Sequence, residues 1–302
     1  MSQDPPTNKR KPESNEEELQ SLLKRPKTIT KTLGQIRIGT RQYKRDGTYT
    51  DPSFPGFIPI VCLTASTKYG SLGPYIVKVT EEGPDKGALI ENVWHSKKVL
   101  PKIPAAFEKI SRYNPTVAWQ YPAVNNLVNN TTGEVDMKQW IEWSTKLCHN
   151  PYPIRYPFSF NPAVRATTLG IIPLEKIAAY RLNPESVKIN AKTDLLGIAD
   201  GRKQVYFYYY MSAVKLQPQY QELKQLLEQG KNLLIIDVDG PRQESLPYYI
   251  EKYKVADNWI ENHTVLWTLE NARIFLNDPK HSCGHTFGLP ACLFGLEREF
   301  LT

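Results

Sequence analysis

The chain has 302 residues, 40% of them hydrophobic and 11% aromatic, so it can bury a substantial core. No run approaches the roughly 18 apolar residues of a membrane span, and the first residues lack the apolar segment of a signal peptide. The four cysteines are widely spaced, which excludes a disulfide framework and predicts an intracellular, reducing compartment. The net charge of +7 permits an anionic partner such as a nucleotide or nucleic acid but does not require one.

Residues 1–31 are polar and contain few large apolar side chains, which predicts a disordered basic tail. Two basic clusters in it, 12 residues apart, are typical of a bipartite nuclear import signal. The import residues are Lys9, Arg10, Lys11, Lys24, Arg25 and Lys27. A nucleic-acid-binding arm or a simply solvated tail would explain the same clusters. The sequence therefore predicts an intracellular protein and leaves nuclear import as one of three uses of the tail.

Residues 32–302 predict an α+β fold, a helix-rich single globular domain with a few short strands. Residues 33–68 indicate short strands and turns, 205–215 is continuous and β-prone, and 232–241 (NLLIIDVDGP) is typical of a buried strand ending in a turn. Helical periodicity or capping predicts helices over 136–148, 219–231, 245–255 and 269–278, then a Gly-containing turn and a hydrophobic helix within 277–296. Because strands and helices do not alternate regularly, a βαβ architecture is not expected.

The stretch 71–98 combines a turn at Gly73-Pro74-Tyr75, a strand-like piece over 76–79, a charged hairpin over 81–87 and a polar, aromatic end. If 90–99 is helical, its residues at i, i+3, i+4 and i+7 share one face. These residues are Glu91, Trp94, His95 and Lys98. Such a face is either a solvated surface with a packed indole or the wall of a ligand site.

Asp237 and Asp239 stand at the carboxyl end of the strand predicted over 232–241. Acids in that position are well placed to contact a ligand or a metal, and Gln243 and Glu244 could complete an oxygen-rich site. The same Asp-Gly-Pro sequence is also typical of a simple turn. Both interpretations stay open.

The run from Asp278 to Cys292 contains His281, Cys283 and His285 at alternate positions. Structural zinc sites use wider ligand spacings, so the run favours a Gly-containing turn whose backbone N–H groups hold a polar ligand or a phosphate. We predict no metal and no cofactor. Walker, GxGxxG, GxSxG and HExxH motifs do not occur in the sequence.

Two segments resemble the motifs of the NADAR family. Leu72-Gly73-Pro74-Tyr75 is followed sixteen positions later by the run from Glu91 to Lys98, similar to the family's Glu-x-x-aromatic-Gln-x-x-Lys. Asp278 and the run 284–289 resemble the family's Asp, Gly-rich turn and Leu-Gly-type helix start. The region between these segments is longer and more divergent.

Three departures from the family pattern are visible. Pro74 replaces an Asn, His95 replaces a Gln, and no Trp closely follows Asp278. The resemblance therefore implies the nucleotide-handling fold more directly than it implies retained activity.

NADAR-type proteins cleave N-glycosidic bonds of ribosylated pyrimidine intermediates or of ADP-ribosylated guanine in nucleic acid, so the resemblance implies an N-glycosidase with a nucleotide or ADP-ribosylated substrate. Glu91 and Asp278 match its acidic catalytic residues and are expected to line one pocket. Carboxylates suit this chemistry because they stabilise the oxocarbenium charge that develops at the sugar. The implied substrate-binding residues are Tyr75, Trp94, His95, Lys98, Gly284 and His285.

The departures, the net charge and the basic tail also support a different class of protein. This alternative is a non-catalytic nuclear or virion-associated scaffold that binds nucleic acid and keeps the fold without turnover. Salt-sensitive DNA binding without glycosidase activity would distinguish it from the enzyme.

Overall fold

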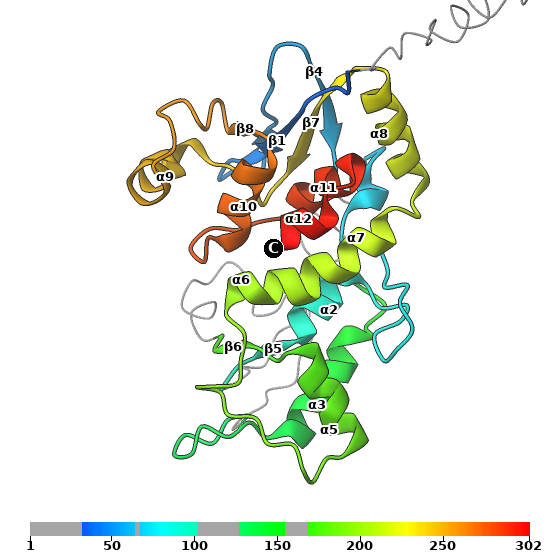
Figure 1. Ribbon diagram of the computed structural model, residues 1–302, viewed down its shortest axis with the longest axis vertical. Coiled ribbons are helices and arrows are strands. Elements are labelled where there is room, and N and C mark those ends of the chain that lie inside the picture. The colour runs from blue at the N-terminus through cyan, green and yellow to red at the C-terminus, as the bar shows by residue number, and fades with distance from the viewer. Residues whose placement is uncertain (1–31, 64–66, 102–126, 155–167) are drawn as a thin grey trace, which may run out of the picture. The chain divides into compact units, whose positions relative to one another are not determined.

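The computed structural model of the chain describes residues 32–63, 67–101, 127–154 and 168–302 (Figure 1). Residues 33–302 form one compact unit in which helices outnumber short strands, and this confirms the predicted α+β, helix-rich domain. The tail over 1–31, with its import clusters, lies outside the described residues.

The core of the fold is a four-stranded mixed sheet with the strand order β4-β7-β1-β8. Strands β1 and β4 both run parallel to β7, and β8 runs antiparallel to β1. The strands of this sheet are β1 (Ile36–Thr40), β4 (Phe57–Val61), β7 (Asn232–Asp237) and β8 (Thr264–Leu266). Two small ladders pair β2 (Gln42–Tyr43) with β3 (Tyr49–Thr50) and β5 (Lys98–Val99) with β6 (Gly170–Ile171).

Strand β7 has neighbouring strands on both sides, so its residues from Leu233 onward are buried, and those from Leu233 to Ile236 are all apolar. The run ends at Asp237, which is only 5% exposed. Because β4 and β7 are parallel, their carboxyl ends meet at one edge of the sheet and bring Cys62 and Leu63 close to Asp237. Ligand sites of open α/β sheets lie at such edges.

Some helices pack around this sheet, and others lie farther from it (Figure 1). They are α2 (Ile90–Ser96), α3 (Met137–Cys148), α5 (Leu174–Leu182), α6 (Ile198–Gly201), α7 (Tyr208–Val214), α8 (Pro218–Glu228), α9 (Leu246–Tyr253), α10 (Leu269–Asn277), α11 (Gly288–Phe294) and α12 (Glu297–Leu301). The short helical turns are η1 (Gly70–Leu72), the π-helical η2 (Arg202–Phe207), η3 (Gln243–Ser245) and η4 (His285–Phe287).

Local signals in the sequence account for several helix ends. The side chain of Asp136 caps α3 by accepting a hydrogen bond from Gln139 N at 3.0 Å. Helix α8 begins with Pro218 and is followed by Gly230, whose φ of 77° lies in the left-handed region. The predicted helices over 136–148, 219–231, 245–255 and 269–278 are therefore confirmed with small shifts at their ends.

The β-prone segment 205–215 is helical, so its strand prediction is wrong. It continues from η2 into α7. Its aromatic and β-branched residues have high strand propensity, but a helix buries one face of them, including Phe207, Tyr210 and Val214. Burial of that face outweighs intrinsic propensity.

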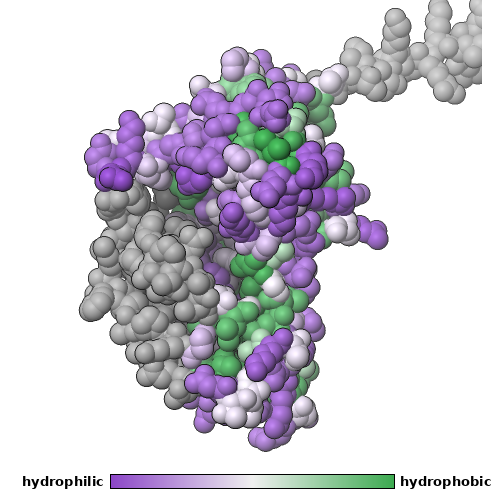
Figure 2. Space-filling model, turned by 90° about the vertical axis from the view of Figure 1, so that its left-hand side faces the viewer, coloured by the Kyte–Doolittle hydropathy of each residue, from purple (hydrophilic) through white to green (hydrophobic). Residues whose placement is uncertain are grey.

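Two hydrophobic clusters form the core, and α2 lies where they meet. The first surrounds the sheet and includes Ile90 and Val93 of α2. The second includes Val99 next to α2 and Trp140 of α3. Figure 2 shows mostly polar side chains around a smaller apolar patch in the upper half of one face, and apolar side chains mixed with polar ones in its lower half.

The stretch 71–98 differs in part from its predicted structure. Residues 76–79 form a turn and one isolated bridge, Lys78 with Leu89, instead of a strand. The predicted hairpin over 81–87 is closed by hydrogen bonds between Val79 and Ala88 and between Gly87 and Val79. The helix predicted over 90–99 ends at Ser96, and Lys98 begins β5.

Candidate functional site

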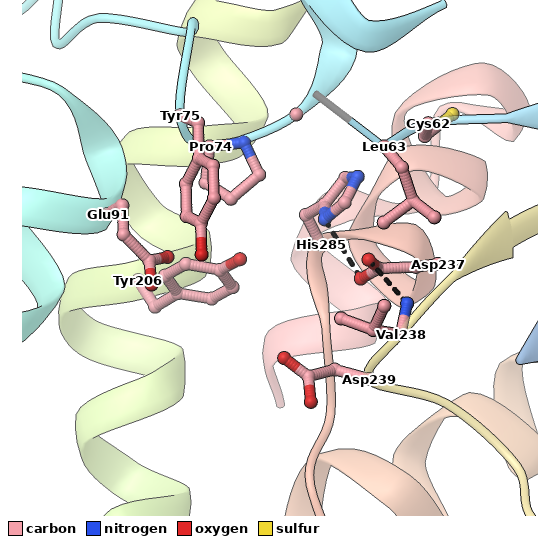
Figure 3. Close-up of a pocket in the computed structure, with 11 residues that line it drawn as sticks. Cys62, Leu63, Pro74, Tyr75, Glu91, Tyr206, Asp237, Val238, Asp239 and His285 are labelled. Atoms are coloured by element: carbon pink, nitrogen blue, oxygen red, sulfur yellow. Dashed lines mark hydrogen bonds and ion pairs between the residues drawn. The ribbon is translucent and has the colours of Figure 1, made fainter. Parts of the chain in front are cut away.

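One pocket joins the start of α2 to the carboxyl edge of the sheet (Figure 3). Its empty volume is about 440 Å³, which includes its open mouth. The residues that line it are Cys62, Leu63, Gly73, Pro74, Tyr75, Glu91, Tyr206, Asp237, Val238, Asp239 and His285. Tyr75, Glu91 and Tyr206 form one wall, and Asp237, Asp239 and His285 form the other.

Glu91 is fixed at the first turn of α2 by the turn that precedes the hairpin. Its backbone N–H donates to the carbonyl of Pro74 at 3.1 Å, and the N–H of Ile90 donates to Val77 at 3.0 Å. These bonds use backbone donors that a helix start leaves without intrahelical partners. The predicted L-G-P-Y and Glu91 motifs therefore meet in space.

Glu91, His95 and Lys98 form a buried chain of polar contacts. Glu91 Oε1 lies 3.1 Å from His95 Nε2, and His95 Nδ1 lies 2.9 Å from Lys98 Nζ. The three residues are only 7%, 6% and 8% exposed. The interpretation of this face as a solvated surface is therefore wrong.

Trp94 and Lys98, both predicted to bind substrate, do not line the pocket. Lys98 Nζ lies 5.3 Å from the centre of the Trp94 ring, and the Trp94 ring lies 5.7 Å from that of Tyr206. Trp94 thus packs behind Tyr206, which itself lines the pocket.

The opposite wall is an aspartate–histidine pair held by a close backbone approach. Asp237 Oδ2 lies 3.2 Å from His285 Nδ1, and Asp237 Oδ1 accepts a hydrogen bond from Val238 N at 2.7 Å. His285 is 2% exposed, and its Nε2 has no hydrogen-bond partner among the described residues. Gly284 is required here because a Cβ would lie 2.5 Å from Asp237 Oδ2 and 2.7 Å from the Asp239 carbonyl oxygen.

Tyr206 extends into the pocket from the π-helical turn η2. Burial raises its pKa well above the ordinary value, and the negative charges of Glu91, Asp237 and Asp239 raise it further. Its phenol therefore stays neutral at physiological pH and can donate a hydrogen bond. π-helical turns are rare and occur often at functional sites.

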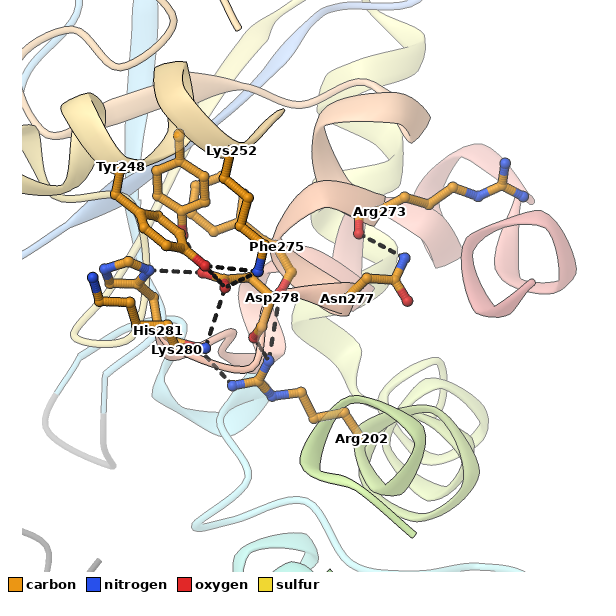
Figure 4. Close-up of polar contacts among 10 residues, drawn as sticks. Arg202, Tyr248, Lys252, Arg273, Phe275, Asn277, Asp278, Lys280 and His281 are labelled. Atoms are coloured by element: carbon orange, nitrogen blue, oxygen red, sulfur yellow. Dashed lines mark hydrogen bonds and ion pairs between the residues drawn. The ribbon is translucent and has the colours of Figure 1, made fainter. Parts of the chain in front are cut away.

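Asp278 does not line this pocket, which corrects the expectation that Glu91 and Asp278 share one (Figure 4). Its buried carboxylate accepts hydrogen bonds from Tyr248 at 2.7 Å and Tyr249 at 3.0 Å and lies 2.7 Å from His281 Nδ1. The Lys280 N–H also donates to it at 3.2 Å. Burial alone would raise the pKa of Asp278, but these hydrogen bonds outweigh it and hold the pKa below its ordinary value.

Asp278 therefore anchors the loop that precedes His285. Arg202 strengthens this anchor by donating to the carbonyls of Asp278 and His281, each at 2.7 Å. The predicted Gly-containing turn delivers His285 to the pocket, while Gly284 contributes through its backbone N–H, which donates to the Asp239 carbonyl at 3.0 Å.

The run from His281 to His285 does not converge on one point. His281 contacts Asp278, His285 contacts Asp237, and burial raises the pKa of the Cys283 thiol to about 12. Within residues 32–63, 67–101, 127–154 and 168–302, no group of three or more His, Cys, Asp or Glu side chains is arranged to hold a metal ion. Asp237 and Asp239 instead contribute carboxylates to the pocket.

No protein-family model, curated protein or solved structure matches this chain. The resemblance to the NADAR family therefore stays a prediction, and the pocket is the feature that bears on function. In the part of the chain that the structure describes, no helix is long and apolar enough to cross a membrane.

The sequence does not identify Tyr206 as a site residue, because its segment has the composition of a strand. It indicates Asp237 and Asp239 as a possible ligand site but does not connect them with Glu91. The available signal was their position at the carboxyl end of the most apolar strand.

Proposed function

We propose that the chain hydrolyses an N-glycosidic bond of a nucleotide or of an ADP-ribosylated base in nucleic acid. The observation that carries the proposal is that Glu91 faces Asp237 and Asp239 across one pocket (Figure 3). Most glycoside hydrolases place carboxyl groups on two sides of the bond that breaks.

The charge of the pocket supports a reaction through a cationic transition state. Glu91, Asp237 and Asp239 line it, and none of the described residues lining it is Lys or Arg. Negative charge stabilises an oxocarbenium ion and repels phosphate. The pocket therefore suits the ribose and base of a substrate whose phosphates stay outside.

The two tyrosines of the pocket supply contacts for the substrate rings. Tyr75 is half-buried and its hydroxyl points toward Tyr206 (Figure 3). Aromatic faces stack on bases without regard to base identity. The neutral Tyr206 phenol can donate a hydrogen bond to the sugar.

The residues of the two pocket walls have different roles in the proposed reaction. Glu91 in its protonated form gives its proton to the leaving base as the glycosidic C–N bond breaks, and Asp239 stabilises the positive charge left on the sugar. Water then attacks the anomeric carbon and loses a proton to His285, which Asp237 orients through Nδ1. The products are the free base and the free sugar hydroxyl, with the charge balanced by one proton given and one taken.

The test is a hydrolysis assay on the full chain with a panel of substrates. The panel contains single-stranded DNA ADP-ribosylated on guanine, NAD⁺, a ribosylated pyrimidine and AMP, and mass spectrometry detects the released base or nucleic acid. We expect wild-type protein to cleave at least one of these substrates. Glu91→Gln is expected to lower turnover about 100-fold to 10,000-fold, because the proton donor is lost.

Glu82→Gln is the matched control for Glu91→Gln. Glu82 lies on the neighbouring hairpin, its side chain is 84% exposed, and it pairs with Lys86. It should retain full activity. Equal rates for wild type and Glu91→Gln would remove Glu91 from the mechanism, and salt-sensitive DNA binding without any release would favour the non-catalytic scaffold instead.

A further inference from the structure

We infer that His95 is a proton relay that connects buried Lys98 to Glu91 and keeps Glu91 supplied with the proton it donates. The inference rests on the proposed function, because it explains how the acid of that reaction is restored. His95 itself does not line the pocket, so it acts through Glu91 as a positioning residue.

The contacts of the relay are continuous and largely buried. His95 Nε2 lies 3.1 Å from Glu91 Oε1, and His95 Nδ1 lies 2.9 Å from Lys98 Nζ. The side chains of His95 and Glu91 are 8% and 10% exposed. The imidazole therefore bridges an acid that lines the pocket and an amine that does not.

The chemistry of the end groups fixes the direction of both hydrogen bonds. An ammonium group has only donors, so Lys98 Nζ donates to Nδ1, and Nδ1 must accept. The proton of the neutral imidazole is then on Nε2 and is donated to the Glu91 carboxylate. This tautomer is the one that both contacts require.

The arrangement allows a balanced proton transfer after each turnover. Lys98 gives a proton to His95 Nδ1, and His95 gives its Nε2 proton to Glu91. The result is a neutral amine, a neutral imidazole with its proton on Nδ1 and a protonated Glu91. Lys98 then regains a proton from solvent and the imidazole returns to its first tautomer.

The surroundings of the relay favour transfer through His95. Tyr206 from η2 faces Glu91, and burial keeps its phenol protonated. Across the pocket are Asp237 and Asp239.

Beyond the end of α2, Lys97 Nζ lies 2.6 Å from Asp85 Oδ1, which also accepts from Cys148 Sγ at 3.4 Å. From α3, Trp140 Nε1 donates to the Lys98 carbonyl at 3.0 Å and holds the backbone that carries the amine. Tyr75, from the turn before α2, is a further titratable group that lines the pocket on the same side as Glu91.

Substitution with glutamine separates a relay from a purely structural bridge. Gln in place of His95 can donate to Glu91 and accept from Lys98, so it can keep both hydrogen bonds, but an amide does not pass a proton from one side to the other. Gln is also the residue that the NADAR pattern has at this position. His95→Gln therefore tests proton transfer with little change in packing.

The experiment combines kinetics with NMR of the full chain. We expect His95→Gln to lower kcat about 10-fold or more with an unchanged KM, and its remaining turnover to rise toward acid pH, because Glu91 must then be protonated from solvent. His95→Ala should recover activity when imidazole is added. His149→Gln, which alters an exposed histidine, should behave as wild type.

The NMR measurement does not depend on turnover. In protein with ¹⁵N-labelled histidine, His95 should carry its proton on Nε2, and Lys98→Met should remove this preference. A proton on Nδ1 would overturn the relay whether or not the protein is active. If the protein is active, an unchanged kcat and pH profile in His95→Gln would overturn it too. If His95 has the expected tautomer but the protein hydrolyses none of the substrates, the proposed function is refuted. The hydrogen-bond geometry of Glu91, His95 and Lys98 is then still established.

Discussion

Two aspartate–histidine pairs, whose histidines are four positions apart in the sequence, have different surroundings. Asp237 lies 3.2 Å from His285 and both residues line the pocket. Asp278 lies 2.7 Å from His281, and two tyrosine hydroxyls and the Lys280 N–H also donate to its carboxylate, outside the pocket. The same two residue types thus form part of a pocket wall in one place and a structural anchor in the other.

The environment of a carboxylate thus determines whether it can meet a ligand. Asp278 is 0% exposed and its oxygens accept hydrogen bonds from several side chains, which leaves it poorly placed to meet a substrate. The Asp239 carboxylate points into the pocket (Figure 3). If this distinction is correct, substitutions at the two sites should separate stability from activity.

The largest effect is expected from Asp278→Asn. The substitution removes a buried negative charge and places an NH₂ group against donors from Tyr248, Tyr249 and His281, so we expect the free energy of unfolding to fall by about 3 kcal/mol. Denaturant unfolding followed by fluorescence measures this change.

Asp239→Asn is the matched variant for this measurement. Because Asp239 is partly exposed, its substitution should change the free energy of unfolding by less than about 1 kcal/mol while reducing turnover strongly. If Asp278→Asn is as stable as wild type, or if Asp239→Asn is the less stable of the two variants, Asp278 is not the structural anchor.

An intermediate effect is expected from Gly284→Ala, which crowds the Asp237 carboxylate and the backbone of Asp239. The added methyl would lie 2.5 Å from Asp237 Oδ2, so the carboxylate or the turn must shift at a cost of about 1–3 kcal/mol. The shift also moves His285, so turnover should fall by more than the lost stability alone would explain.

Gly197→Ala provides the control for an added methyl group. No atom lies within 4 Å of the Cβ position at Gly197, and its φ of −64° suits any residue. Activity and unfolding should both stay near wild type. Full activity in Gly284→Ala would show that the close approach between the turn and Asp237 is not needed.

Much of this fold was predictable because its signals are local. The apolar run that ends at Asp237, the Asp136 cap and the helix before Gly230 each depend on neighbouring residues. The helical structure of 205–215 was not predictable in the same way. Its strand propensity is outweighed by contacts with residues far away in sequence, such as the 2.9 Å hydrogen bond from Tyr210 to the Leu72 carbonyl.

The site was predictable only in part. The spacing of Glu91 and His95 predicts a shared helix face, and in the structure the two side chains lie on one buried face and contact each other. The partner of Glu91 could not be found by spacing, because Asp237 and Asp278 are both acids followed by turns. The parallel pairing of β4 and β7 brings Asp237 to the pocket, whereas Asp278 follows α10 and is held by Tyr248, Tyr249 and His281.

The smallest effect is expected in the pH dependence of the stability that Asp278 contributes. Hydrogen bonds hold the pKa of Asp278 below its ordinary value despite its burial. A carboxyl group with a lowered folded-state pKa stabilises the fold above its unfolded pKa, about 3.9, and this contribution is lost as the pH falls through the folded pKa. The difference in unfolding free energy between wild type and Asp278→Asn should therefore be constant from pH 8 to pH 6 and become smaller below about pH 4. Urea unfolding at a series of pH values measures it, with Glu82→Gln giving a difference near zero throughout. A difference that grows toward acid pH would mean that Asp278 is held in its protonated form, and the anchor would then be a neutral hydrogen-bond network instead of a buried carboxylate.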